Sequence, residues 1–450
     1  MASAPQSGVA ASLCHRTPKH LFMSSTRSTF FRQSAWLILA TTVNGVFMIA
    51  VHMVASQIQS AEYAVFGTLL KVFLLMSFPA VGLQVIFTQQ AAAAVSETER
   101  HRVAAATRAL LQGTLFIWAV LGGLVLVQQK TVVSLLKISN PAALWITVVL
   151  GLGSLWLPIL RGLLQGRQRF LGLGWVAILD GIARFTAVAF AVWLGGQAAG
   201  GMVGVLAGQS VALSVAFWLT REFWFGPRDG FEWRTWFRQL VPLTLASSSV
   251  LMMTCGDVVF VQAVFKKGET EYYVAGQLIG VALVMFTTPL AAVMFPKIVE
   301  SAARAHRTDA LRLALGASAL IAALAGLACT LFPELPLRIL FFRKPEFWKS
   351  ATLVPWFAWA LVPLILTNVL VNNLIARGKF QIAPWLALTA IGYATTLLLI
   401  RERLLQVEFF DAFKMVIRTL GLFSLLLLAI SLLFTWKEFG RATQQDSAAT

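Results

Sequence analysis

The sequence predicts an all-α polytopic membrane protein with about 12 transmembrane helices, arranged as two six-helix lobes around a central cavity. Three observations lead to this fold class: an apolar composition, apolar runs of membrane-spanning length and an internal repeat. Of the 450 residues, 58% are hydrophobic and only 12% are charged, and the mean hydropathy is +0.76. Soluble domains are typically about half apolar and about a quarter charged, so the composition indicates a membrane protein.

The apolar runs place the predicted spans along the chain. They lie near residues 34–54, 64–88, 104–127, 142–160, 172–194, 201–220, 238–262, 273–295, 310–331, 351–375, 384–400 and 415–435. Each run is close to the roughly 20 residues that cross a hydrocarbon core of about 30 Å. The segment 401–414, between the last two runs, has a second interpretation as a short helix at the membrane surface.

Five regions follow from these spans. They are a cytoplasmic N-terminal segment (1–33), an N-terminal six-helix lobe (34–220), a cytoplasmic linker (221–237), a C-terminal six-helix lobe (238–436) and a cytoplasmic tail (437–450). We expect residues 1–22 to be unstructured, with Met23 as an alternative start of the native protein. The first apolar run is long for a signal peptide and has no clear cleavage site, so we interpret it as an uncleaved spanning helix.

The formal net charge of +17 has two interpretations, nucleic-acid binding and membrane topology. The basic residues are scattered in short loops between apolar runs, which favours topology and argues against a nucleic-acid partner. With the N-terminus in the cytoplasm, the cytoplasmic segments hold nearly twice as many lysines and arginines as the outer loops. This bias predicts that both termini are cytoplasmic, although the loops 333–350 and 401–414 run against it.

An internal repeat relates the two halves of the chain. The segment EYAVFGTLLKV (62–72) matches EYYVAGQLIGV (271–281) at six of eleven positions, 209 residues later. Two shorter matches have an offset of 210 residues: Pro79 with Pro289, and Arg169-Phe170 with Lys379-Phe380. Six spans return the chain to the side on which it began, so we expect parallel repeats. Two lobes with a cleft between them favour an alternating-access transporter, although channels and membrane enzymes also contain duplications.

Asp180 and Arg184 lie deep in the predicted span 172–194. Residues four apart share one face of a helix and are within salt-bridge reach. Such a pair must face protein or water and not lipid, because charge in hydrocarbon is costly. One interpretation is a self-neutralised pair that orients the span. The other is that Arg184 offers a forked donor to an anionic substrate while Asp180 positions it.

Lys71 and Asp257 are the other charged residues inside predicted spans that we single out. Lys71 has no acid within reach along its own helix, so it either has a partner on another helix or lines a cavity for a phosphate-bearing substrate. Asp257 either binds a coupling proton or cation, or pairs with Lys266 or Lys267 in the following loop.

Gly196, Gly200, Gly204 and Gly208 recur every four residues near the start of the predicted span 201–220. This spacing predicts a smooth stripe against which another helix packs closely. Cys14, Cys255 and Cys329 lie far apart without a CxxC motif, so we expect free thiols, no metal site and no cofactor. No phosphate-binding loop and no HExxH or GxSxG motif occurs, and the outer loops are short, which argues against an enzyme.

Two segments resemble a known family. RGLLQGRQRFLGLGWVAILDGIARF (161–185) is similar to the loop into the fifth span of polysaccharide flippases. The segment 256–301 resembles the seventh and eighth spans of the same family, with Asp257, Tyr272 and Phe295-Pro296-Lys297 in the family's order. The chain thus resembles the polysaccharide-biosynthesis branch of the multidrug/oligosaccharidyl-lipid/polysaccharide exporter superfamily.

The resemblance implies a function. Members of the family are V-shaped proteins of two six-helix lobes that move polyprenyl-diphosphate-linked sugars across the bacterial cytoplasmic (inner) membrane by alternating access. The expected partners are therefore a lipid-linked oligosaccharide, membrane lipids, and the glycosyltransferases and polymerase of the same pathway. In this chain the cationic cavity for the diphosphate would contain Lys71 and Arg184, with Asp180 and Asp257 as cavity or coupling residues. The alternatives are a cation-coupled multidrug antiporter of the same superfamily and a membrane glycosyltransferase or polymerase.

Overall fold

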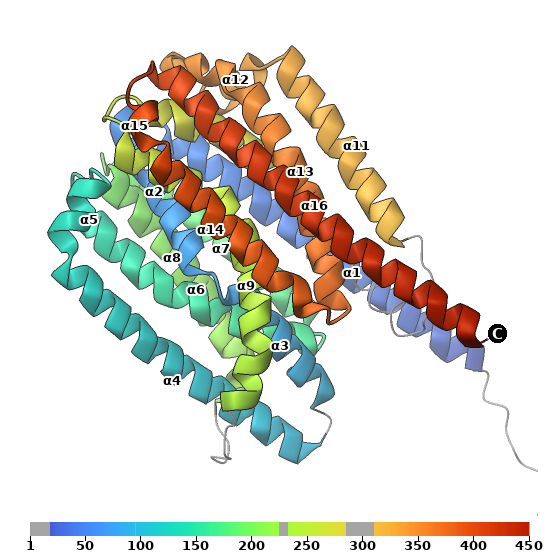
Figure 1. The fold of residues 1–450 in the computed structure, drawn as a ribbon. Helices are drawn as coiled ribbons and strands as arrows, with labels where there is room; N and C mark the ends of the chain where they lie inside the picture. The colour runs from blue at the N-terminus through green and yellow to red at the C-terminus, as the bar shows by residue number, and fades with distance from the viewer. Residues whose placement is uncertain (1–18, 95, 225–232, 285–309, 450) are drawn as a thin grey trace, which may run out of the picture.

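The computed structural model describes residues 19–94, 96–224, 233–284 and 310–449, and these residues form a bundle of long helices (Figure 1). In chain order, the helices of the first half are α1 (Lys19–Ala55), α2 (Ser60–Met76), α3 (Ala80–Ala93), α4 (Glu97–Val127), α5 (Gln129–Leu135), α6 (Ala142–Gly166), α7 (Phe170–Trp193), α8 (Ala198–Leu219) and η1 (Arg221–Phe223). Those of the second half are α9 (Trp233–Val264), α11 (Ala310–Leu331), α12 (Glu334–Leu340), η2 (Pro345–Thr352), α13 (Val354–Ala376), η3 (Phe380–Ile382), α14 (Ala383–Leu399), α15 (Arg401–Leu404) and α16 (Phe409–Ala449). A further helix occupies residues 270–284, at the end of its described segment.

Ten of the described helices are long and apolar enough to cross a membrane. They are α1, α4, α6, α7, α8, α9, α11, α13, α14 (with η3) and α16, and each overlaps a predicted span. The predicted span 273–295 begins within helix 270–284 and continues outside the described residues. The segment 401–414 holds the four-residue helix α15 and the first turns of α16. Residues 19–22, predicted to be unstructured, belong to α1.

The predicted continuous span 64–88 is wrong in one respect, because the structure divides it into α2 and α3. The break lies at Ser77–Pro79, between the end of α2 at Met76 and the start of α3 at Ala80. Proline has no backbone N–H and its ring crowds the preceding turn, so a helix ends or bends there. The Ser77 hydroxyl donates to the Leu74 carbonyl oxygen at 2.5 Å, which satisfies an acceptor at the end of α2.

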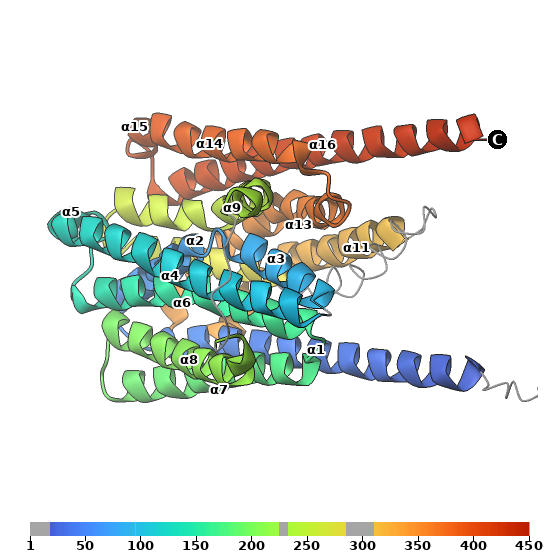
Figure 2. The same ribbon diagram turned by 90° about the horizontal axis from the view of Figure 1, so that it is seen from below.

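The two halves show the same pattern of contacts between corresponding helices. In the first half α1 packs on α7, α7 on α8, α8 on α6 and α6 on α4. In the second half α9 packs on α14, α14 on α16, α16 on α13 and α13 on α11. Figure 2 shows α1, α7 and α8 together on one side, α14 and α16 on the opposite side, and α2 and α3 between them. In addition, α2 and α3 pack on α9, so they join the halves.

The ends of α6 and α13 carry the same backbone turn. Gln168 has φ +56° and Gly378, 210 residues later, has φ +68°. The amide of Arg169 donates to Leu164 O, and the amide of Lys379 donates to Leu374 O, both at 2.9 Å. This pattern of a left-handed residue with a six-residue backbone hydrogen bond is the Schellman motif. The sequence match at Arg169-Phe170 and Lys379-Phe380 therefore marks equivalent turns, whereas Pro289 lies outside the described residues.

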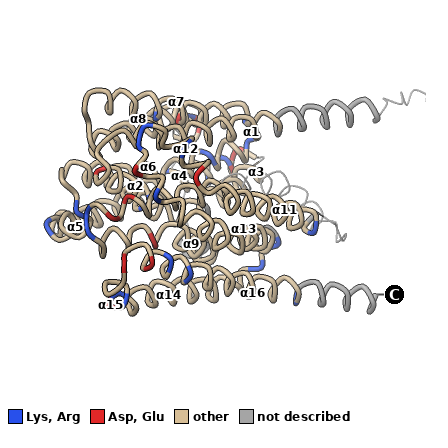
Figure 3. Tube along the Cα trace, turned by 90° about the horizontal axis from the view of Figure 1, so that it is seen from above, with Lys and Arg blue, Asp and Glu red and all other residues tan. Residues whose placement is uncertain are grey.

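The molecule has two distinct ends. The start of α1 and the end of α16 project together from one end, which we call the terminal end (Figures 1 and 2). The short helices α5, α12 and α15 lie at the opposite end, which we call the short-helix end. Figure 3 shows long uncharged stretches along α14 and α16. Large apolar side chains are exposed along the outer helices, such as Phe116 on α4, Leu313 on α11 and Leu422 on α16, as expected of a surface that faces lipid.

Candidate functional site

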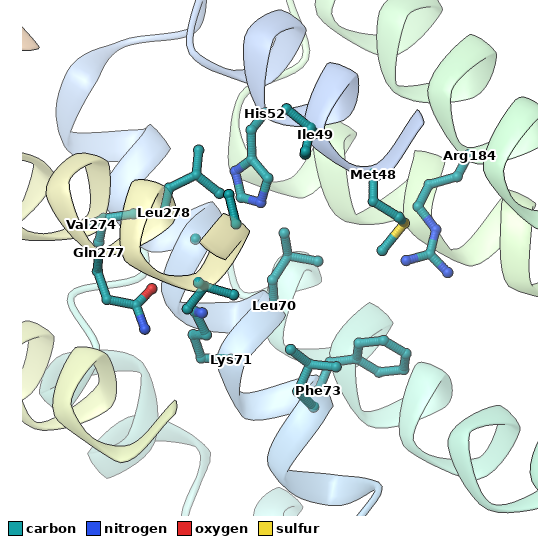
Figure 4. Close-up of a pocket in the computed structure, with 14 residues that line it drawn as sticks. Met48, Ile49, His52, Leu70, Lys71, Phe73, Arg184, Val274, Gln277 and Leu278 are labelled. Atoms are coloured by element: carbon teal, nitrogen blue, oxygen red, sulfur yellow. The ribbon is translucent and has the colours of Figure 1, made fainter. Parts of the chain in front are cut away.

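A cavity lies where helices of the two halves meet. It is lined by Met48, Ile49 and His52 of α1, by α2 from Gly67 to Leu74, by Arg184 of α7 and by helix 270–284 (Figure 4). The helices come close because Gly67 faces Val274, where a Cβ atom at Gly67 would lie 2.5 Å from Val274 Cγ1. The space open to the centre of a water molecule is about 90 Å³, enough for several waters. Most of the lining is apolar, and its charged described residues are Lys71 and Arg184.

Lys71 lies in the middle of α2 and is 9% exposed. Among the described residues, no carboxylate oxygen lies within 4.0 Å of its ammonium group. The carboxylate of Asp257, in the second half, is within electrostatic range but makes no direct contact. A buried ammonium group without a direct partner retains three free hydrogen-bond donors, so Lys71 offers the cavity a strong anion-binding group.

Arg184 reaches the cavity from α7 on the side away from helix 270–284 (Figure 4). Its Nη2 donates to Asp180 Oδ1 at 2.8 Å, so the predicted pair forms. A second arginine completes a triad, because Arg161 Nη2 of α6 lies 3.6 Å from Asp180 Oδ2. Two cations share one carboxylate, and the triad keeps a net positive charge. The Nε atoms of Arg161 and Arg184 are buried and have no hydrogen-bond partner among the described residues, so both guanidinium groups retain donors.

His52 is a further polar residue in the cavity wall. Its Nδ1 lies 3.2 Å from the hydroxyl oxygen of Tyr63, and its ring is within electrostatic range of Lys71. Its position on α1 places it between the cavity and the start of α2. The sequence contained a signal for it, since His52 is an ionisable residue inside the predicted span 34–54.

Asp257 is fully buried in α9 and does not line the cavity. Its Oδ2 accepts a hydrogen bond of 2.8 Å from the Tyr273 hydroxyl, and its Oδ1 has no partner among the described residues. Lys267, a predicted alternative partner, instead donates to Ser139 Oγ at 3.0 Å. No ion pair joins Asp257 to Lys266 or Lys267 in the described part of the chain.

The glycine stripe lies beside the arginine triad. A Cβ atom at Gly208 would lie 2.5 Å from Arg184 Cβ, and one at Gly204 would lie 2.5 Å from the Val188 backbone nitrogen. Gly200 faces Ala191 at ordinary contact distance, and Gly196 precedes α8 and lies close to Ala191 O. The stripe lets α8 approach the segment of α7 that carries Arg184.

These residues form a site suited to an anion. Lys71 and Arg184 supply positive charge from two helices of the first half, and Arg161 adds to it through Asp180. Cations in a wall of low polarity attract phosphate oxygens more strongly than they do in water. No group of three or more metal-ligating side chains occurs among the described residues. Cys255 and Cys329 are buried free thiols.

The predicted site residues therefore fall into two groups. Lys71 and Arg184 share the cavity and Asp180 lies behind Arg184, while Asp257 belongs to a separate buried cluster in the second half. Arg161 was missed because its partner Asp180 is on another helix and no spacing along the chain marks the contact.

The fold is shared with several solved transporters. An inward-facing multidrug resistance MATE family transporter of the MOP superfamily has a TM-score of 0.67 at 12% identity, over 91% of this chain and 99% of that one. A MOP superfamily transporter from Pyrococcus furiosus, whose structure was reported for the reverse polarity of its binding pocket, has a TM-score of 0.66 at 12% identity, over 92% and 96% of the two chains. The lipid II flippase MurJ, in an inward closed conformation, has a TM-score of 0.65 at 12% identity, over 89% and 87%.

Sequence comparison gives the family. No curated protein matches the chain in sequence. The family model described as polysaccharide biosynthesis protein matches residues 30–302, which is more than half of the 450 residues. This match includes α1 from residue 30 onward, α2, α7, the arginine triad and helix 270–284. The chain is a multi-pass membrane protein and belongs to the polysaccharide biosynthesis protein family.

Proposed function

We propose that this protein is a flippase that moves a polyprenyl-diphosphate-linked oligosaccharide across the bacterial cytoplasmic membrane for cell-surface polysaccharide synthesis. The observation that carries the proposal is the cavity between the halves, whose charged described lining residues are the cations Lys71 and Arg184. In such a lipid the diphosphate carries the negative charge that cations bind, whereas the apolar polyprenyl tail remains in the bilayer. In this role Lys71 and Arg184 bind the diphosphate, and Asp180 holds Arg184 in place.

The proposed mechanism is alternating access between two six-helix lobes, residues 34–220 and 238–436. It is supported by the matching order of helix packing in the two halves and by the matching turns after α6 and α13. A cavity with about 90 Å³ of water-accessible space is much smaller than the several hundred Å³ that a drug-sized ligand fills. In this proposal the substrate therefore requires the halves to separate.

Substitution of the cavity cations tests the proposal. Lys71→Ala and Arg184→Ala should each reduce substrate binding about tenfold or more, because a hydrogen bond to a charged group contributes about 1.5–3 kcal/mol. The readouts are surface polysaccharide in a strain that lacks its own flippase and flipping of a fluorescent polyprenyl-diphosphate sugar in proteoliposomes. Lys130→Ala and Arg401→Ala remove exposed cations outside the cavity and serve as matched controls. If both cavity variants flip at the wild-type rate with equal protein levels, the assigned roles are wrong.

A cation-coupled multidrug antiporter is the second candidate. The fully buried Asp257, with one oxygen unpartnered among the described residues, is the observation that favours it. Asp180 is less suited to bind a cation because it faces two arginines. Proton- or sodium-driven export of a cationic dye by proteoliposomes, abolished by Asp257→Asn, would establish this function over the flippase.

We further propose that transport is the whole role of the chain, without a glycosyltransferase or polymerase activity of its own. The partners would be the lipid-linked substrate, membrane lipids, and the glycosyltransferases and polymerase of the pathway.

Both termini would lie in the cytoplasm, so the terminal end would lie at the cytoplasmic surface. A C-terminal alkaline phosphatase fusion should then be inactive, while the same fusion after Asn140, at the short-helix end, should be active.

A further inference from the structure

A chain of side chains connects the cavity with the short-helix end. His52 faces the cavity, and its Nδ1 lies 3.2 Å from Tyr63 Oη. Tyr63 is fully buried in the first turn of α2, and His52 is the described partner of its hydroxyl group. The rings of His52 and Tyr63 meet edge to face with centroids 6.1 Å apart. A change in the cavity that moves His52 therefore changes the only described hydrogen bond of the Tyr63 hydroxyl group.

Tyr63 also contacts the second half of the chain. Its ring packs edge to face on Phe341 at 5.7 Å and tilted on Phe347 at 5.4 Å, and these two rings lie 4.9 Å apart. Phe341 directly follows α12 and Phe347 lies in η2, and both are at most 1% exposed. We call Tyr63, Phe341 and Phe347 the aromatic plug, and it closes the contact between the halves at this end.

Polar contacts surround the aromatic plug. The Ser60 hydroxyl donates to Glu346 Oε1 at 2.5 Å, and Arg343 Nη1 donates to Gln57 Oε1 at 3.1 Å. Both contacts join the first half to the second, but they are exposed to solvent, where such bonds contribute little. The buried plug and the hydrogen bond that orients Tyr63 therefore contribute more to the closure than these two exposed contacts do.

We propose that His52 is a positioning residue that couples anion binding in the cavity to opening of the short-helix end. This inference rests on the proposed function, since the anion is the diphosphate of the substrate. In the proposed tautomer His52 carries its proton on Nδ1 and donates to the Tyr63 oxygen, and a phosphate oxygen beside Lys71 is a charged and therefore stronger acceptor for this N–H. The ring then turns toward the anion, and Tyr63 keeps a buried hydroxyl without a partner. That loss destabilises the closed plug and favours separation of the halves.

The internal repeat supplies a matched control. Tyr272 occupies the position of Tyr63 in the repeated segment, 209 residues later. Its ring stacks on Phe409 at 6.0 Å and packs on Phe410 at 5.7 Å, both within the second half. Tyr272→Phe therefore removes the same atom at the equivalent position without touching the contact between the halves.

The test measures opening directly. Spin labels report the separation by double electron–electron resonance in nanodiscs. They are placed at two exposed positions, Asn140 in the loop after α5 and Lys349 in η2, which follows α12. The background protein carries alanine in place of Cys14, Cys255 and Cys329. Without ligand, Tyr63→Phe and His52→Ala should each raise the ratio of open to closed protein about two- to tenfold, the effect of one hydrogen bond.

The double variant should open no further than either single variant, and Tyr272→Phe should match the wild type. Wild-type distances in both Tyr63→Phe and His52→Ala would overturn the proposal. Additive effects in the double variant would also overturn it, because His52 would then act independently of Tyr63.

Addition of undecaprenyl diphosphate separates this inference from the proposed function. The wild type should bind it and shift toward the open distances, whereas His52→Ala should bind it with no further shift. If the wild type does not bind the lipid, the proposed function fails. If both proteins bind it and open to the same extent, only the coupling role of His52 fails.

Discussion

Asp180 neutralises part of the buried positive charge in the first half, because arginines from two helices pair with its carboxylate. The side chains of Asp180 and Arg184 are 8% and 5% exposed, and Arg161 approaches from α6. Breaking a buried ion pair leaves an uncompensated charge and typically costs about 3–5 kcal/mol. The acid therefore has a structural role whether or not a substrate is bound.

Asp180→Asn should lower the melting temperature of the purified protein clearly, because the amide cannot balance two guanidinium groups. Asp411→Asn is the control, since Asp411 forms an exposed pair with Lys414 at 2.8 Å and such pairs contribute about 0–1 kcal/mol. The double variant Asp180→Asn/Arg184→Gln should recover part of the loss. Equal melting of the two single variants would contradict the charge-balance argument.

Single residues show where the sequence was informative and where it was not. Local rules found Lys71 and the Asp180–Arg184 pair, because charge inside an apolar run and a four-residue spacing are visible along the chain. They did not find Arg161, whose contact with Asp180 joins two helices. The rule that identified Lys71, an ionisable residue inside an apolar run, also applies to His52. His52 was not identified because a neutral histidine is not counted as a charge.

Among the helices, the close packing of α8 on α7 depends on glycine. A Cβ atom at Gly204 would lie 2.5 Å from both the backbone nitrogen and Cγ2 of Val188. A side chain can rotate away from such a clash, but the backbone of α7 cannot. The two helices would have to separate, which would also move Arg184 one turn away on the same helix.

Gly204→Ala should therefore destabilise the protein by about 1–3 kcal/mol, the usual cost of overpacking. Gly123→Ala in α4 is the control, because no atom lies within 4 Å of the added Cβ and alanine favours helix formation. Thermal unfolding followed by fluorescence-detected chromatography compares the two. A melting temperature for Gly204→Ala at or above that of Gly123→Ala would show that α7 and α8 tolerate a wider spacing.

Helix positions followed from the apolar runs, since each of the ten described membrane-length helices overlaps a predicted span. The error at 64–88 has a simple cause: hydropathy measures the polarity of a segment and not its continuity. Pro79 interrupts the segment without changing its polarity. Proline does not always break a helix, as Pro158 lies inside α6.

At the scale of the molecule, the proposed transport cycle requires the halves to separate at the short-helix end. Gln57 and Arg343 lie on opposite halves with 3.1 Å between Oε1 and Nη1. A cross-link between Gln57→Cys and Arg343→Cys should stop flipping of a fluorescent lipid-linked sugar, and reduction should restore it. The control pair Glu334→Cys and Arg338→Cys lies within α12 and constrains no motion between the halves. Unchanged flipping by the fully cross-linked protein would rule out opening at this end.

The repeat was the feature that predicted the most about the whole molecule. Short matches between 62–72 and 271–281 indicated two related halves, and the same order of helix packing is found in both. The aromatic plug could not be predicted, because Tyr63 and Phe341 are far apart in the sequence and their contact has no counterpart in the repeat. Tyr272 stays within its own half, so symmetry alone would have predicted the wrong contact.

The cations of the site all come from one half of the molecule. Lys71, Arg161 and Arg184 lie on α2, α6 and α7, while helix 270–284 contributes an uncharged wall. In the proposed cycle the phosphates would therefore stay bound to the first half of the molecule throughout. In that cycle the second half would move relative to the bound phosphates without breaking a direct ion pair to Lys71, Arg161 or Arg184 among the described residues, and this would limit the electrostatic work of the motion.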